Sequence, residues 1–236
     1  MIVYGANPVL EALRAHPERV RWVAVSREGG RRGQRIVEAA REAGVAVRFP
    51  GAKELARLAG GGVHNGVVAE VSSGAYAGFE EAVAAAEVVF LLDGITDPQN
   101  LGAILRVADA FGVDLIVIPE HDSAGLTPAA VKASAGAAEW VRVAQVTNLA
   151  RAIERLKREE FWIWGAAADG EPADRVDLRG KTGLVLGSEG KGIRRNVLEH
   201  CDGRVAIPMQ GHVGSLNVAA AAAVLAYELR RQRGKD

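Results

Sequence analysis

Short apolar runs alternate with helix-like segments from residue 80 onward, and this alternation restricts the fold more than any other feature of the sequence. The runs are apolar throughout, as in strands that are covered on both faces. Strands separated by helices form a mainly parallel sheet with helices packed on it. The predicted strands are 88–92, 115–118, 161–166, 183–186 and 204–207, and the predicted helices are 98–112, 128–138, 148–160, 191–200 and 216–232. Ligands of such sheets bind beyond the carboxyl ends of the strands, so we expect a site in the loops there.

The first part of the chain has a separate, smaller α/β pattern. Its helix-like segments and extended segments alternate before a run of Ser, Gly and Ala at 72–78 that has no apolar period and is typical of a linker. We therefore predict an N-terminal α/β domain at 1–72, a linker at 73–83 and a second domain at 84–236. The helix-like segments of the first domain are 8–15, 34–43 and 52–58, and the extended segments are 20–26, 45–49 and 66–71.

Composition sets broad limits on the class of protein. No apolar stretch of the 236 residues approaches the roughly 20 that a membrane helix needs. The chain opens without the basic start and apolar block of a secretory signal, and its one cysteine, Cys201, cannot form an internal disulfide. We therefore expect a cytoplasmic protein with no membrane segment.

The charge of the chain is balanced. The 29 basic and 29 acidic side chains give no support for nucleic-acid binding, which usually relies on a cationic surface. A local basic patch is compatible with a neutral total, and Arg27, Arg31, Arg32 and Arg35, around two glycines, are the candidates. A solvated loop and helix start is an equally good interpretation of these four arginines.

The first of three loops at predicted strand ends runs from residue 93 to 106. Asp97 before Pro98 suits a helix N-cap with proline at the first helical position. An apolar stripe at helical spacing follows, and Arg106 points away from its centre. A surface ion pair with Asp109 is the alternative role for Arg106.

The second and third loops are rich in glycine. The second, 186–193, has neither the Walker spacing nor the dinucleotide-binding spacing, but its carboxylate, Glu189, lies among residues that hold the backbone open. The third, 207–218, leads into an alanine-rich helix, for which Ser215 or Asn217 is a suitable cap.

The histidines and the cysteine give little support for a metal site or a catalytic thiol. The five histidines are scattered, and the neighbours His200 and Cys201 lack ligand spacing, so we expect no metal site. A structural, partly buried role is the better interpretation of Cys201.

Taken together, the three loops resemble the three motifs of the SpoU/TrmH family of SPOUT methyltransferases. Each motif is weak alone, but their order, spacing and position at strand ends are specific, and the resemblance covers the whole chain. Segments 5–13 and 64–69 resemble the N-terminal domain of the branch that methylates a guanosine of 23S ribosomal RNA, and segments 93–98 and 132–139 resemble its catalytic part. The motifs are Asn100-x-Gly102-x-x-x-Arg106, Gly187-Ser188-Glu189-Gly190, and Ile207-Pro208-Met209 with Ser215-Leu216-Asn217.

This resemblance implies a fold, a cofactor and an assembly. The family's catalytic part forms a deep trefoil knot, an exception to the rule that chains do not thread themselves. It binds S-adenosyl-L-methionine in the knotted loops and works as a homodimer with the site at the interface, and its N-terminal domain binds RNA. Carried over by motif position, the cofactor-binding residues are Gly187, Ile207, Met209 and Leu216, and the catalytic residues are Asn100, Arg106, Glu189, Ser215 and Asn217.

The implied reaction is methyl transfer to a ribose 2′-hydroxyl of a 23S guanosine. Two alternatives remain at this point, a transfer-RNA ribose methyltransferase and a non-catalytic RNA-binding or ribosome-assembly protein. Arg106 is the family's favoured general base, yet a guanidinium stays protonated in nearly every protein setting. We therefore expect Arg106 to bind the phosphate beside the target ribose, with Glu189 fixing Arg106 or a contact across subunits.

Overall fold

The structure, a computed structural model, describes residues 1–72 and 76–234. By their mutual contacts, the residues group into two units, Met1–Ala75 with Leu126–Trp140, and Tyr76–Gly125 with Val141–Asp236. The segment Leu126–Trp140 therefore groups with the first unit, whereas the linear boundaries predicted above place it in the second domain. The reason is apolar packing, since Val131 and Ala138 join the core of the first unit.

The first unit is built on a four-stranded mixed sheet in the order β1-β4-β2-β3. The strand β4 pairs antiparallel with β1 and with β2, and β2 pairs parallel with β3. β1 was not predicted, because three residues are too few to show a period. The elements are β1 (Ile2–Tyr4), α1 (Ala6–Ala15), β2 (Val20–Val25), α2 (Gly30–Glu42), β3 (Ala46–Arg48), α3 (Ala52–Leu58), β4 (Val67–Val71) and α6 (Pro128–Ala133), with short 3-10 turns at Pro17–Arg19 and Ala137–Glu139.

The second unit confirms the predicted mainly parallel sheet. Its six strands run parallel in the order β10-β8-β9-β5-β6-β7. The strands are β5 (Val88–Asp93), β6 (Leu115–Pro119), β7 (Arg142–Val146), β8 (Trp162–Pro172), β9 (Thr182–Gly187) and β10 (Gly203–Ala206). The helices are α4 (Phe79–Ala84), α5 (Pro98–Phe111), α7 (Leu149–Arg158), α8 (Arg195–Leu198) and α9 (Val218–Gln232).

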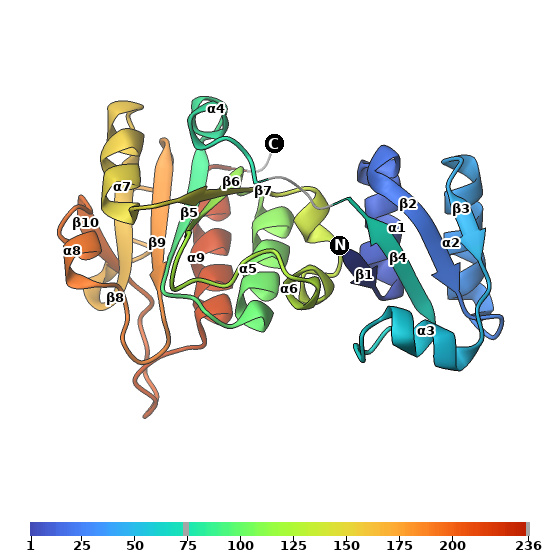
Figure 1. Ribbon diagram of the computed structural model, residues 1–236. Coiled ribbons are helices and arrows are strands. Elements are labelled where there is room, and N and C mark those ends of the chain that lie inside the picture. Colours follow the sequence, from blue (N-terminus) through green and yellow to red (C-terminus); the bar gives the residue numbers. More distant parts are fainter. Residues whose placement is uncertain (73–75, 235–236) are drawn as a thin grey trace. The chain divides into compact units, whose positions relative to one another are not determined.

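Both faces of this sheet are covered. Alternate strand residues such as Val89 and Leu91 pack with α4 and α7 into one core. Residues between them, such as Phe90, point to the opposite face because side chains alternate along a strand. The helices α5 and α9 lie side by side and pack on each other (Figure 1). The sheet is therefore buried on both faces, as its continuous apolar strands predict.

Three differences from the predicted elements have local causes. The strand β7 was missed because Arg142 and Gln145 interrupt its apolar pattern at the edge of the sheet. The helix α8 has only four residues, since most of 191–200 forms a loop. The helix α4 covers the last part of the predicted linker 73–83 and ends at Ala84, because Ala82 and Val83 are buried in the core. Residues 73–75 of that linker lie outside the described residues.

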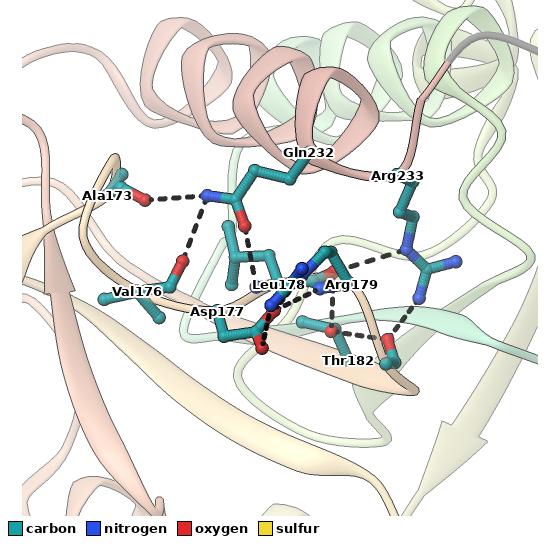
Figure 2. Close-up of polar contacts among 9 residues, drawn as sticks. Ala173, Val176, Asp177, Leu178, Arg179, Thr182, Gln232 and Arg233 are labelled. Atoms are coloured by element: carbon teal, nitrogen blue, oxygen red, sulfur yellow. Dashed lines mark hydrogen bonds and ion pairs between the residues drawn. The ribbon is translucent and has the colours of Figure 1, made fainter.

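The C-terminal end of α9 is tied to the segment that precedes β9 (Figure 2). The Gln232 side-chain amide donates to the carbonyls of Ala173 and Val176, at 3.2 and 3.0 Å, and its oxygen accepts from the Leu178 amide at 2.9 Å. Arg233 Nε donates to the Leu178 carbonyl at 3.3 Å. These bonds to backbone groups hold the end of α9, the helix that directly follows the third motif. No helix among the described residues is long and apolar enough to span a membrane.

Candidate active site

The strand order reverses at β5 and β9, and the sequence motifs meet at this point. The chain leaves β5 toward β6 and β7 on one side, whereas β9 lies on the other side of β5. Asp93 and Gly187, the last residues of the two strands, are register partners. In open parallel sheets a crevice forms at such a switch point, beyond the carboxyl ends of the strands.

The second motif forms a tight loop after β9. The amide of Ser188 donates to the Gly192 carbonyl at 3.2 Å, and the amide of Gly192 donates back to the Ser188 carbonyl at 2.9 Å. A Cβ atom on Gly187 would lie 2.2 Å from the carbonyl carbon of Gly192, so only glycine fits there. This close approach is the physical reason for the glycine that opens the motif.

A buried carboxylate that was not among the predicted site residues anchors the end of this loop. Asp93 is 1 % exposed. It accepts hydrogen bonds from the backbone amide and from the Nε of Arg194, both at 2.7 Å, and the Arg194 Nη2 atom completes an ion pair at 2.7 Å. The available signal was an acidic residue at the end of an otherwise apolar strand, since buried charges are paired.

Three predicted catalytic residues form one hydrogen-bonded cluster. The Asn217 side-chain amide donates to Asn100 Oδ1 at 3.0 Å and also to Glu189 Oε1. Asn100 Nδ2 donates to the same Glu189 oxygen at 3.5 Å. Asn217 Oδ1 accepts from the Ala219 amide at 2.9 Å, so Asn217 also caps α9. The capping role and the site role predicted for Asn217 are compatible because its oxygen and nitrogen serve different partners.

A cavity of about 630 Å³ opens beside this cluster, which is within the range of small-molecule sites. Its lining combines apolar side chains with the glycine loop and one ion pair, Arg204 with Asp169. Six of the predicted site residues line it: Gly187, Glu189, Ile207, Met209, Ser215 and Leu216.

Arg106 lies apart from the other predicted site residues. It sits on α5, is exposed and does not line the cavity. No residue that the structure describes forms an ion pair or a side-chain hydrogen bond with it, so the alternative pairing with Asp109 is absent from this part of the chain. The neighbouring predictions for α5 are confirmed: Asp97 caps it by accepting from the Gln99 amide at 2.9 Å, and its apolar stripe is buried.

The single cysteine, Cys201, is partly buried. Burial raises the pKa of the Cys201 thiol to about 11, and the neighbouring Asp202 carboxylate adds to the shift. The thiol contacts the Val197 carbonyl at 3.5 Å. Among the residues with described positions, no three His, Cys, Asp or Glu side chains are grouped as metal ligands would be.

We expect Cys201 to react slowly with iodoacetamide at neutral pH. Raising a thiol pKa from 9.0 to about 11 lowers the thiolate fraction roughly 100-fold, and the thiolate is the reactive form. Alkylation of native and guanidinium-unfolded protein, followed by mass spectrometry, measures the difference. Equal rates for the two states would contradict this account of the thiol.

The fold and the site define an α/β protein with a cavity beside β8, β9 and β10 of its parallel sheet. The model of the SpoU rRNA methylase family matches residues 87–227, and the model for the substrate-binding domain of RNA 2′-O ribose methyltransferases matches residues 2–77. The chain belongs to the SpoU rRNA methylase family. Its resemblance to the family's motifs is therefore confirmed over both parts of the chain.

Individual relatives match over nearly the whole length. The 23S rRNA (guanosine-2′-O-)-methyltransferase RlmB of Pseudomonas aeruginosa is 44% identical, with 98% of this chain and 96% of that protein covered. A solved structure of a TrmH-family protein from Porphyromonas gingivalis is 29% identical, with a TM-score of 0.80 over 98% of this chain and 89% of that one. The SpoU methyltransferase AviRb from Streptomyces viridochromogenes, solved with the cofactor AdoMet, is 24% identical and has the same fold, with a TM-score of 0.82 over 99% and 90% of the two chains.

Proposed function

We propose that this protein transfers a methyl group from S-adenosyl-L-methionine to the ribose 2′-hydroxyl of a guanosine in 23S ribosomal RNA, in the cytoplasm. The observation that carries the proposal is the cluster of Asn100, Glu189 and Asn217 at the rim of the cavity. The relatives named as RlmB, 38–44% identical over nearly their whole length, support the choice of substrate. We also propose that the loops around the cavity form the trefoil knot that the family implies.

The cavity fits the proposed methyl donor. Its volume suits a nucleoside with an amino-acid tail, and the apolar side chains of Ile207, Met209 and Leu216 suit the flat faces of a base. The Gly187 loop offers backbone groups without side-chain obstruction, and Arg204 and Asp169 offer both charges to a zwitterionic tail. The donor, when bound there, supplies a methyl group on a positively charged sulfur.

The residues of the cluster position the acceptor. Glu189 accepts hydrogen bonds from the side-chain amides of both Asn100 and Asn217, so it orients both amides toward itself. With the hydroxyl of Ser215 they form a set of donors and acceptors suited to the hydroxyls of a ribose. Positioning of this kind supplies much of the rate acceleration when a nucleophile must lie in line with its target. No metal is needed for this chemistry.

A homodimer would complete the site. Exposed apolar side chains lie on α9 at Val224 and Tyr227, which are 43% and 59% exposed, and beside the cavity at Leu216. An exposed apolar patch of this kind fits a second copy of the chain. Arg106 does not line the cavity of its own chain, and its guanidinium is free among the described residues to bind an RNA phosphate at the partner's site.

Mixed dimers test the role of Arg106 across the interface. Arg106→Ala and Asn217→Asp chains are each expected to be inactive, but a mixed dimer would hold one intact site. Random mixing should restore about a quarter of wild-type activity, because half of the dimers are mixed and each has one working site. If Arg106 acted within its own chain, mixing would restore nothing.

Methyl transfer from labelled S-adenosylmethionine to unmodified 23S ribosomal RNA and to unmodified transfer RNA, run in parallel, tests the substrate. We expect label in 23S RNA and none in transfer RNA. Label in transfer RNA alone would retain the chemistry and overturn the substrate. Cofactor binding without label in either RNA would favour a non-catalytic RNA-binding protein.

A further inference from the structure

The balanced total charge hides an asymmetry along the chain. Residues 1–75 carry 11 Lys and Arg against 7 Asp and Glu, a net charge of +4, and the rest carries 18 against 22, a net charge of −4. Most of this positive excess lies in one stretch, residues 27–48, which holds six arginines and three glutamates. An anionic macromolecule would therefore meet its attractive surface on the first unit.

Five of the six arginines of this stretch are exposed and have no ion-pair partner among the described residues. Arg27, Arg31, Arg32, Arg35 and Arg41 form no ion pair or side-chain hydrogen bond within residues 1–72 and 76–234, although three glutamates lie close in sequence. Most arginines elsewhere are paired, for example with Glu80, Glu199 or Glu228. Unpaired guanidinium groups bind phosphate in bidentate fashion without first breaking an ion pair.

A cavity of about 460 Å³ opens within this basic stretch. The end of β2, the glycine turn 29–30 and one face of α2 form its walls, and Arg27, Gln34, Arg41 and Phe49 contribute side chains. Phe49 is 44% exposed, and no aromatic ring among the described residues packs against it. Glu38 is the one carboxylate among the lining residues, and a carboxylate is an acceptor suited to base amino groups.

We propose that this α2 cavity, with the arginines around it, binds an unpaired nucleotide of the RNA substrate. The base stacks on Phe49, Arg27 and Arg41 hold its phosphates, and Arg31, Arg32 and Arg35 bind the flanking backbone. Aromatic stacking beside guanidinium groups is the usual chemistry of single-stranded RNA recognition. This inference rests on the proposed function and assigns its RNA-contacting surface.

The test is equilibrium binding of the full-length protein to in vitro transcribed 23S ribosomal RNA over a range of salt concentrations. We expect the triple variant Arg31→Gln, Arg32→Gln, Arg35→Gln to bind at least about tenfold more weakly. The slope of log binding constant against log salt concentration should be shallower by roughly 2. Phe49→Ala should weaken binding about fivefold or more through lost stacking. Cofactor binding should stay unchanged in both variants.

Matched control variants remove the same number of arginines, or one aromatic ring, from the second unit. Arg151→Gln, Arg158→Gln, Arg175→Gln takes three exposed arginines from the second unit, and Trp162→Ala removes an aromatic ring that is 60% exposed. Equal losses in variants and controls would overturn the inference while leaving the proposed function intact. Unchanged RNA affinity with weaker binding to ribosomal particles would indicate a protein partner and also overturn it. A wild-type protein that binds no 23S RNA would overturn both.

Discussion

Asn217→Asp should reduce methyl transfer about 100-fold or more while leaving the fold and its stability nearly unchanged. Aspartate caps a helix as well as asparagine, so the bond from the Ala219 amide survives. The side chain, however, loses the N–H that joins Asn100 to Glu189, and two carboxylates come to face each other. Misplacement of catalytic groups by about 1 Å costs on the order of 100-fold in rate.

Asn217→Ser is the matched control for the charge. Serine also caps the helix but adds no carboxylate, so it separates loss of the amide from repulsion of Glu189. Turnover and thermal unfolding of both variants, with the wild-type protein, measure the effect. If Asn217→Asp keeps wild-type turnover, the cluster does not position the acceptor.

Arg194→Ala should be the most destabilising single change near the site. It leaves the buried Asp93 carboxylate without its cation, and an unpaired buried charge costs about 3–5 kcal/mol. Because the Arg194 side chain is 52% exposed, water compensates in part, and we expect about 2–3 kcal/mol. The loop that carries Glu189 also loses its anchor, so cofactor affinity should fall as well.

A double-mutant cycle with Asp93→Asn isolates this interaction. In the double variant no charge is left unpaired, so it should be more stable than Arg194→Ala alone. Denaturant unfolding of the four proteins gives the coupling free energy. A coupling near zero would mean that the pair does not hold the loop.

The second unit could be predicted from the sequence because its strands and helices differ in period and in apolar content. β5, β6 and β9 are continuous apolar runs, and α5 has both a cap signal and an apolar stripe. The edge strand β7 and the grouping of Leu126–Trp140 with the first unit were not predicted. Their positions depend on tertiary packing, which leaves no periodic signal.

The sequence indicated which residues belong to the candidate site better than it indicated how they are arranged. Motif spacing placed Asn100, Glu189 and Asn217 at strand ends, and the structure brings them together. Spacing could not reveal that Asp93 holds the glycine loop, because its partner Arg194 lies 101 residues away. It also could not show that Arg106 stands apart from its own cavity.

Nucleoside analysis of methylated 23S ribosomal RNA tests the central claim most directly. After reaction with wild-type protein and labelled S-adenosylmethionine, the RNA is digested to nucleosides and the labelled product is identified by mass spectrometry. The account predicts one labelled product, 2′-O-methylguanosine, and a strong loss of it with Asn217→Asp. Label on a base, or equal label with both proteins, would contradict the account.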